Sequence, residues 1–531
     1  MTRRPFGALA IAFAFAAVAA VVALAAEASA PGHTLTAQER RGRQIYLTGE
    51  SPSGKPMTAS MGGSSLSLPG SILPCANCHG YDGRGKPEGG VVPPEIRWEA
   101  LTKPYGRSGS DGRLTPPHNE ATLAAAITAG VDPAGNALSP AMPRYALDSG
   151  DLSALVAYLR RLGEDRDPGV TSDKITIGTV LMATGPAAEA SRAAHDVIAA
   201  YFEEVNERGG VYSRRLKLSS GAPSRAPLPE EVFAVINAAP GESGSDLVSW
   251  CDVGGIPCID PFTTSPAENA VVSRYVFYLF SGIKTQALAL VDFAAQAGEV
   301  SGVRAAIVSS PGAVPPGILD AVEAQCRSKG FAAVDRVAYR PGGSDAAEIS
   351  RRLKTAPTTA IFVLAPPGAE SELMREAARL DWAPNVYLSG SLVGREILAA
   401  PPAFKDRIFV AYPFWPPDPD APGIRDLLAF LARQSQPPTH LVAQLSAYAA
   451  AKVLVEGLQR AGRDVSREKL VEVLEGFYGF ETGVTPPIVF GPNLHIGVEG
   501  ASIGVVDLDA KTLRRVNPPD GTNHEEKLPK R

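Results

Sequence analysis

The sequence has few cysteines, no long basic run and only one long apolar run. Five cysteines in 531 residues are too few to build a small, disulfide-rich scaffold. A net charge of −5 without a Lys/Arg run provides no basic surface for nucleic acid, so we expect no nucleic-acid partner. After residue 30 no segment of about twenty apolar residues remains, so we expect no membrane span beyond the N-terminal segment.

The composition of the remaining chain is that of a folded protein. Apolar residues make up 45% of the chain and charged residues 20%, which leaves enough apolar content for sizeable cores. A chain of this length predicts about three compact units.

The N-terminal segment resembles a targeting signal. Arg3 and Arg4 precede the apolar run 6–26, and small residues follow up to Ala30. This pattern is typical of a secretory signal peptide over residues 1–30, so we expect an exported, periplasmic protein. Two alternatives stay open: the run is long enough to remain as a membrane anchor, and residues 2–6 resemble a twin-arginine signal. Pro31 argues against cleavage directly after Ala30.

Residues 31–163 are expected to form the first domain. It opens with a helix over 36–47 and closes with one over 151–162, capped by Ser149 or Asp151. The segment between residues 50 and 73 is rich in Ser, Gly and Pro and reads as a loop insertion. Residues 164–173 form a polar linker.

Residues 174–520 alternate between short β-branched runs and amphipathic helices, before a polar tail over 521–531. Strand, helix, strand in sequence predicts a parallel sheet with helices on both faces. The expected strands are 175–181, 305–308, 359–364, 385–388 and 408–410, and the expected helices include one through 194–205 and one over 317–329.

Cys75-Ala76-Asn77-Cys78-His79 has the C-x-x-C-H spacing that attaches c-type haem. Two thiols on one helical turn can each bond a vinyl group, while the adjacent His79 reaches the iron. A thioredoxin-like pair or half of a zinc site are the alternatives, but no second C-x-x-C follows. We therefore predict one covalent haem c on Cys75 and Cys78.

With Gly80-Tyr81-Asp82-Gly83-Arg84-Gly85, the motif resembles the small bacterial cytochromes c. The resemblance covers residues 36–163 and implies an all-α domain in which a downstream methionine is the second iron ligand. Met142, shortly before the closing helix, fits that place. The alternatives are that His118, Met57 or Met61 binds the iron, or that the sixth position is open.

The second half of the chain resembles the leucine/isoleucine/valine-type periplasmic binding proteins. The resemblance rests on the segments 174–188, 205–211, 256–266 and 339–345, and on Ala447-Tyr448. It implies an α/β type I fold of two lobes that close on a small ligand at strand ends.

The family pattern gives the candidate pocket residues. They are Thr184, Gly185, Phe262, Thr264, Ser389 and Ser391, with an aromatic wall from Tyr412, Phe414 and Trp415. For each Ser or Thr the alternative role is a helix cap or turn residue, and for the aromatic residues it is packing at the hinge.

Three departures from the pattern argue against an amino-acid ligand. The family's acidic loop and second helix are replaced by the Pro-rich piece 222–230, the loop 309–315 lacks a tyrosine, and 238–245 lacks a serine motif. Cys251 and Cys258 are spaced to close a small disulfide loop, or Cys258 is a buried strand residue, while Cys326 is expected to be buried.

These features predict a periplasmic electron-transfer protein rather than an enzyme. Its binding module is expected to bind a small molecule or to dock a redox partner such as a periplasmic dehydrogenase. One alternative is a substrate-binding receptor for an ABC permease with an accessory haem, and another is a peroxidase-like haem enzyme. The short linker also motivates the hypothesis that ligand closure shifts the haem potential.

Overall fold

The structure is a computed structural model that describes residues 35–61, 66–87, 89–108, 112–163, 166–182, 187–221, 231–239, 246–266, 272–296, 302–340, 345–415 and 420–516. The signal segment expected over 1–30 and the polar tail expected over 521–531 lie outside these ranges. The chain divides into two compact units, Met1–Ser172 and Asp173–Arg531.

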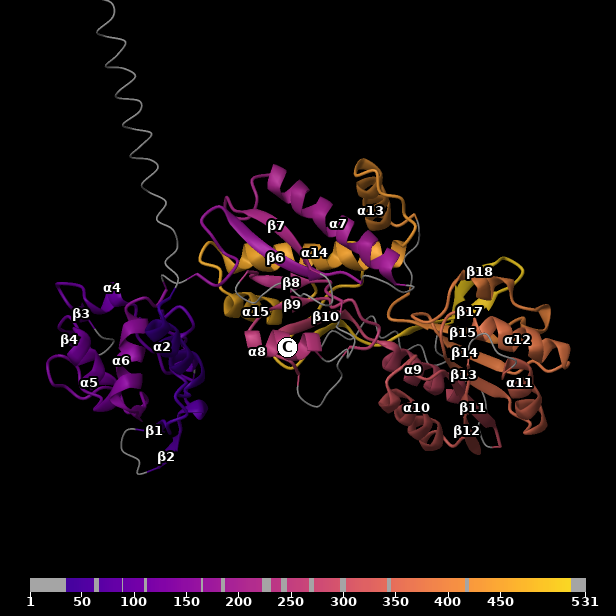
Figure 1. The fold of residues 1–531 in the computed structure, drawn as a ribbon, viewed down its shortest axis with the longest axis horizontal. Coiled ribbons are helices and arrows are strands. Elements are labelled where there is room, and N and C mark those ends of the chain that lie inside the picture. Colours follow the sequence, from indigo (N-terminus) through magenta and orange to yellow (C-terminus); the bar gives the residue numbers. More distant parts are fainter. Residues whose placement is uncertain are drawn as a thin grey trace, which may run out of the picture. The chain divides into compact units, whose positions relative to one another are not determined.

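The first and last helices of the first unit pack against each other (Figure 1). Helix α2 (Ala37–Thr48) crosses α6 (Ser149–Leu159) so closely that a Cβ added at Gly42 would lie 1.9 Å from the carbonyl oxygen of Ala154. Only glycine permits this approach. The N-cap of α6 is Asp148, whose carboxylate accepts from the Asp151 amide at 2.8 Å, so the predicted caps Ser149 and Asp151 are wrong.

The expectation of an all-α first domain is not confirmed, because short strands accompany the helices. The shorter helices are α3 (Cys75–His79), α4 (Trp98–Leu101) and α5 (Glu120–Thr128). Strands β2 (Ser67–Pro69), β1 (Thr58–Ser60) and β5 (Arg144–Ala146) form an antiparallel sheet, and β3 (Arg107–Ser108) pairs with β4 (Leu114–Thr115). The segment interpreted as a loop insertion therefore contains a hairpin.

The second unit contains two sheets, and the first is fully parallel. Its strand order is β16-β10-β9-β8-β6-β7, with β6 (Lys174–Val180), β7 (Arg215–Gly221), β8 (Ala234–Ile236), β9 (Cys258–Ile259), β10 (Val276–Phe280) and β16 (Ile496–Val498). Its helices are α7 (Ala188–Glu207), α8 (Asp246–Gly254), α14 (Leu441–Ala461) and α15 (Arg467–Glu475).

The second sheet has the order β12-β11-β13-β14-β15-β17-β18. It is formed by β11 (Arg304–Ser309), β12 (Ala333–Ala338), β13 (Ala360–Leu364), β14 (Asn385–Ser389), β15 (Ile408–Tyr412), β17 (Ser502–Asp507) and β18 (Thr512–Arg515). The strands expected from the β-branched runs are confirmed. The sheet is not wholly parallel, because β17 and β18 form an antiparallel hairpin at one edge.

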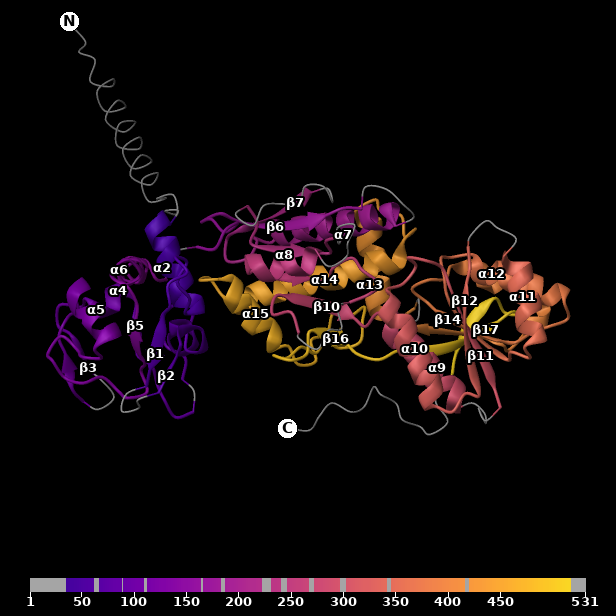
Figure 2. The ribbon, with the colours of Figure 1, turned by 60° about the horizontal axis from the view of Figure 1, so that its bottom comes forward.

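Helices cover both faces of the second sheet, as the alternating pattern predicts (Figure 2). Helices α9 (Ile283–Gln296) and α10 (Pro316–Ser328) lie on one face, and α11 (Asp345–Thr355) and α12 (Ala369–Arg379) on the other. Each face has its own apolar core cluster. Because both faces are buried, the interior strand β13 is buried along its whole length.

The chain passes between the two sheets three times. It leaves the first sheet after β10, returns after β15 through α13 (Pro422–Arg433) to α14, and crosses again between β16 and β17. Three crossings make this unit two lobes joined by a hinge. Among the described residues, α14 is long and apolar enough to span a membrane, but most of it is buried and it packs against α7.

Candidate functional site

The C-x-x-C-H motif forms one helical turn, α3, that buries its histidine. His79 is only 7% exposed, and its Nδ1 lies 3.0 Å from the carbonyl oxygen of Pro94. A carbonyl can only accept, so Nδ1 carries the proton and Nε2 is left with its lone pair. An imidazole oriented by a backbone carbonyl in this way is typical of a metal ligand.

Burial also sets the protonation of this turn. Desolvation lowers the pKa of His79, which keeps the ring neutral, as a ligand must be. Desolvation raises the pKa of Cys75 to about 11, whereas Cys78 is exposed. The turn therefore presents one half-buried thiol, one exposed thiol and a neutral imidazole.

Two glycines let the chain fold back beside this turn. Gly83 and Gly85 have positive φ, and a Cβ on Gly85 would lie 2.2 Å from the carbonyl oxygen of Pro93. The Gly85 amide donates to the His79 carbonyl at 2.8 Å. The return loop thereby brings Pro94 onto the histidine ring, which explains the glycine spacing after the motif.

The candidates for a second iron ligand lie in different surroundings. Met142 is half-buried in the loop before β5, Met57 is 6% exposed in the apolar core, and Met61 is 36% exposed on the hairpin. His118 is 7% exposed, its Nδ1 has no hydrogen-bond partner among the described residues, and burial lowers its pKa. Burial in the core favours a packing role for Met57.

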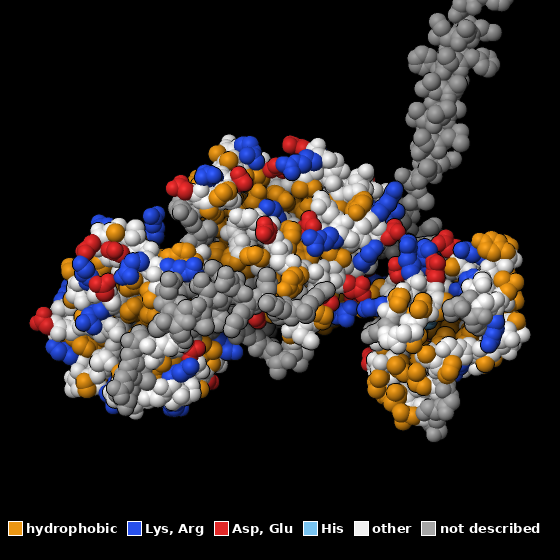
Figure 3. Space-filling view, turned by 180° about the vertical axis from the view of Figure 1, so that it is seen from behind, with side chains coloured by type: hydrophobic (Ala, Val, Ile, Leu, Met, Phe, Trp, Pro, Cys, Tyr) orange, Lys and Arg blue, Asp and Glu red, His pale blue; other side chains and the backbone are white. Residues whose placement is uncertain are grey.

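These residues fit a haem group. The buried, neutral, carbonyl-oriented His79 beside two cysteines on one turn is the donor set that covalent haem needs. A porphyrin also needs apolar surroundings, and Ala76 belongs to the apolar core cluster of this unit, against which Cys75 and Ile96 pack. Figure 3 shows hydrophobic side chains gathered on one face of the unit. The described residues contain no group of three or more His, Cys, Asp or Glu side chains able to hold a metal ion.

In the second unit, two candidate pocket residues lie on the loop after β9. Phe262 is half-buried and its amide donates to the Ala238 carbonyl at 2.9 Å, while Thr264 is exposed and its carbonyl accepts from the Ile283 amide. The loop thus packs beside the first crossing segment, leaving the Thr264 side chain open to solvent. Thr184 and Gly185 lie outside the described residues.

Ser389 and Ser391, at the carboxyl end of β14, share a partner that the sequence reasoning missed. Gln286 of α9 is fully buried, and its Oε1 accepts from the Ser389 hydroxyl at 2.6 Å. Its Nε2 lies 2.9 Å from the Ser391 hydroxyl. Gln286 therefore joins both serines to α9, and nothing in its local sequence marks it out.

The aromatic candidates pack at the lobe crossings. Phe414 stacks on Phe280 with ring centroids 5.0 Å apart, which joins the second crossing to the first. Tyr412 lies against Gly390, where a Cβ would come within 2.4 Å of its ring, and Trp415 lies similarly against Gly504. Contacts of this kind fit packing at the hinge, so both roles predicted for these aromatic residues stay predictions.

A buried polar cluster lies at the strand ends of the first lobe. Asp260 follows β9 and is 7% exposed, and its carboxylate accepts from the hydroxyl of Ser446 at 2.5 Å and the amide of Asn237 at 3.4 Å. Desolvation raises its pKa to about 6. Both Asp260 and Asn237 have positive φ, which is costly for a residue with a Cβ.

The remaining cysteines are all buried thiols in this structure. Cys251 on α8 and Cys258 on β9 share one apolar cluster. Burial raises the pKa of the Cys258 thiol, and the neighbouring Cys251 side chain adds to the rise. The disulfide between them stays a prediction. Cys326 is buried on α10, as expected.

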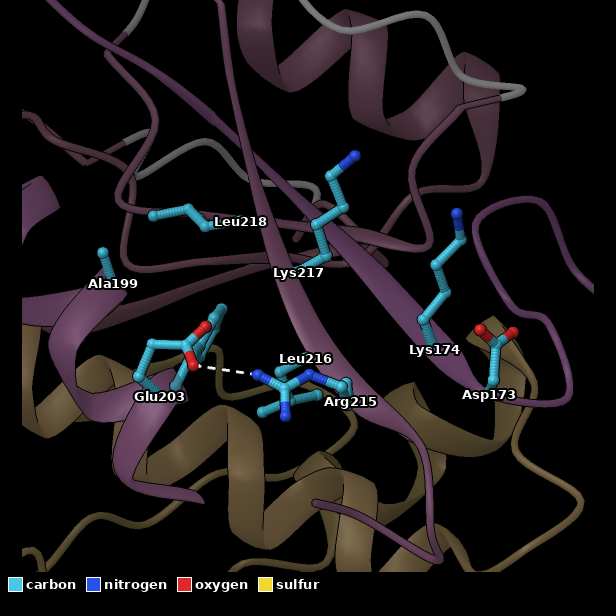
Figure 4. A pocket seen from close by; sticks show the side chains of 9 residues that line it. Asp173, Lys174, Ala199, Glu203, Arg215, Leu216, Lys217 and Leu218 are labelled. Atoms are coloured by element: carbon cyan, nitrogen blue, oxygen red, sulfur yellow. Dashed lines mark hydrogen bonds and ion pairs between the residues drawn. The ribbon is translucent and has the colours of Figure 1, made fainter. Parts of the chain in front are cut away.

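An open hollow of about 380 Å³ lies beside the edge strand β7, and Figure 4 shows the side chains that line it. Its lining includes Lys174 and Arg215, the first residues of β6 and β7, and Arg215 pairs with Glu203 at 3.0 Å. The hollow thus lies at the amino ends of parallel strands. Ligand sites of such sheets lie at the carboxyl ends, so this hollow is not the candidate pocket.

A serine, a histidine and an aspartate are joined by hydrogen bonds on the first lobe. His195 lies 2.8 Å from the Ser220 hydroxyl through Nε2 and 3.0 Å from Asp196 through Nδ1. The Asp196 side chain is 61% exposed and is the next residue on the same helix. A catalytic triad buries its acid to orient the histidine, so this arrangement does not support hydrolysis.

Two family models match the chain. The periplasmic binding protein family matches residues 174–511, and the cytochrome c family matches residues 73–163. The two matches lie in separate units of the chain. A comparison with curated proteins finds no significant match.

Solved structures of ABC-transporter binding proteins share the fold of the second unit. A fatty acid ABC transporter substrate-binding protein from Thermomonospora curvata has a TM-score of 0.55 at 20% identity, covering 67% of this chain and 94% of that one. A branched chain amino acid ABC transporter protein from Thermus thermophilus with bound valine has a TM-score of 0.55 at 18% identity, covering 65% and 96%. At these identities the likeness establishes the fold.

Proposed function

The chain belongs to the periplasmic binding protein family, and from this premise we propose that it is a periplasmic c-type cytochrome whose fused two-lobed module binds a small ligand. The observation that carries the proposal is the turn Cys75–His79, where a buried imidazole is held by the Pro94 carbonyl beside two cysteines. Its role in transferring single electrons rests on that turn.

The residues of the first unit would perform distinct tasks. Cys75 and Cys78 would fasten one haem c covalently, and His79 and Met142 would bind its iron. Haem held there supplies a one-electron couple. The Pro94 carbonyl keeps the His79 ring oriented and its Nδ1 protonated, and burial keeps the ring neutral. A thioether from Met142 would raise the reduction potential relative to a second histidine.

The binding module is proposed to close on its ligand by bending at the three crossing segments. The carboxyl ends of β6, β9, β14 and β15, together with the segments that follow them in the sequence, carry the candidate contacts. These are Thr184, Gly185, Phe262, Thr264, Ser389, Ser391, Tyr412 and Trp415. One similar structure is a fatty acid ABC transporter substrate-binding protein and the other has bound valine, so the two are associated with unlike ligands. The departures from the family pattern argue against an amino acid here.

Purification of the native protein and a ligand-uptake measurement separate this proposal from the two alternatives. Native exported protein should show a covalent haem with a methionine-ligated spectrum that peroxide leaves unchanged, and a small molecule identifiable by mass spectrometry in the extract. A spectrum that peroxide converts would favour a haem enzyme. Ligand uptake that persists after Cys75 and Cys78 are replaced by Ala would favour a receptor for an ABC permease.

A further inference from the structure

The hairpin β1–β2 lies outside the segment that matches cytochrome c, which begins at residue 73. Its strand β1 pairs along its whole length with β5, the strand that begins two residues after Met142. The register is Thr58 opposite Ala146, Ala59 opposite Tyr145, and Ser60 opposite Arg144. The hairpin is therefore hydrogen-bonded to the strand that follows the loop between Leu138 and Arg144. This loop contains Met142 and is called the methionine loop below.

The base of the hairpin is fixed against α2. Gly49 ends α2 and Gly70 follows β2, and their backbones are so close that a Cβ on either residue would come within 2.5 Å of the other's carbonyl oxygen. The Gly70 amide also donates to the Met57 carbonyl at 2.9 Å. The hairpin is thus anchored to an outer helix of the unit and can act as a rigid support.

The Arg144 side chain forms hydrogen bonds to the backbone of the methionine loop. Its guanidinium donates to the carbonyl of Met142 and, at 3.1 Å, to that of Leu138, so one side chain bridges the two ends of the loop. The side chain lies over Gly130, where an added Cβ would come 1.6 Å from the Arg144 Nε. Charge-assisted hydrogen bonds from a planar fork fix geometry as well as energy.

The same strand also reaches the haem turn. Tyr145 is 5% exposed, and its hydroxyl donates to the Leu73 carbonyl at 2.6 Å, two residues before Cys75. Strand β5 therefore bonds to the hairpin through its backbone, to the methionine loop through Arg144 and to the start of the haem turn through Tyr145.

We propose that Arg144, supported by the hairpin β1–β2, is a positioning residue that holds the loop of Met142 in place for iron ligation. The proposal rests on Met142 as the sixth ligand. Arg144 does not touch the iron; it restrains the backbone on both sides of Met142 so that the thioether stays at the metal when other ligands compete. The hairpin pairs with strand β5, which begins at Arg144.

The experiment measures how easily imidazole displaces the methionine in the whole, haem-loaded protein. The readouts are the long-wavelength absorbance band of ferric iron–methionine ligation and the reduction potential. For Arg144→Leu, which loses two charge-assisted hydrogen bonds, we expect half-displacement at an imidazole concentration about tenfold lower. Arg144→Lys should recover part of the loss, because an ammonium can still reach one carbonyl.

Two further variants keep the test informative. Gly130→Ala places a Cβ against the Arg144 side chain and also strains a backbone with a φ of 68°, and we expect it to weaken methionine ligation in the same direction. Arg160→Leu is the matched control, because Arg160 pairs with Glu120 on the surface of the same unit and should leave displacement unchanged. Haem content and helical circular dichroism report whether each variant folds.

The outcomes separate this proposal from the one on which it rests. A wild-type protein without the methionine band overturns ligation by Met142, and with it the role of Arg144. A wild-type band that Arg144→Leu and Gly130→Ala leave as resistant to imidazole as Arg160→Leu overturns the positioning role alone.

Discussion

The two candidate sites of this chain are built in opposite ways. In the first unit the cysteines and histidine come from five consecutive residues on one turn, and the group that orients the histidine is the carbonyl of Pro94, fifteen residues away. In the second unit the candidate contacts come from loops spread over more than two hundred residues, and their partners, such as Gln286, come from other elements. A site on one turn can be read from spacing, whereas a site assembled by tertiary structure cannot.

The substitutions with the greatest predicted consequence remove the haem site of the first unit and leave the second unit unchanged. Replacing Cys75 and Cys78 by Ala should abolish covalent haem, because a thioether bond needs the sulfur. The binding module should still unfold at its wild-type temperature, since its core is separate. Haem staining after denaturing electrophoresis and calorimetry test this. Cys326→Ala is the control, and haem that survives the double substitution would contradict the assignment.

A second prediction uses the buried carboxyl of Asp260. Its pKa is raised from 3.8 to about 6 in the folded state, so the folded protein holds the proton more tightly than the unfolded chain. The contribution of Asp260 to the free energy of unfolding is therefore constant at pH below 3.8, and it decreases as the pH rises to about 6. The loss is on the order of 2–3 kcal/mol.

Asp260→Asn should remove that loss. The melting temperature of the variant relative to wild type should increase as the pH is raised from acid to neutral, and then level off. Asp252→Asn is the matched control, because Asp252 is exposed. A difference between Asp260→Asn and wild type that does not change with pH would show that Asp260 is not buried as an acid.

A third prediction concerns the glutamine that joins the two serines. Gln286→Leu keeps the size of the side chain but leaves the buried Ser389 hydroxyl without its partner, which costs about 1–3 kcal/mol of unfolding free energy. Chemical denaturation of the second unit measures this. The half-buried Gln325, changed to Leu, serves for comparison. Equal stability of the Gln286 variant and wild type would show that the serines are free for ligand.

The smallest predicted effect returns to the first unit. Tyr145→Phe removes the hydrogen bond to the Leu73 carbonyl, and we expect a loss of about 1 kcal/mol in the unfolding free energy of that unit. Tyr105→Phe is the control, because Tyr105 is 73% exposed. The unfolding of the second unit should be identical in both variants; a change there would contradict the independence of the two cores.

Much of the architecture follows from the sequence because it depends on local patterns. The periodicity of Leu155, Val156 and Leu159 predicts the buried face of α6, and the β-branched runs predict the strands of the second sheet. The hairpin β1–β2 could not be predicted, because it depends on pairing with β5, about eighty residues later. The partners Gln286 and Arg144 could not be predicted either, since their roles arise only when distant elements pack.

Covalent haem attachment can be examined directly by mass spectrometry of the proteolytic peptide that contains Cys75–His79 from the exported protein. We expect this peptide to carry the mass of one haem on its two cysteines. A peptide with free thiols, or with an internal disulfide, would contradict it.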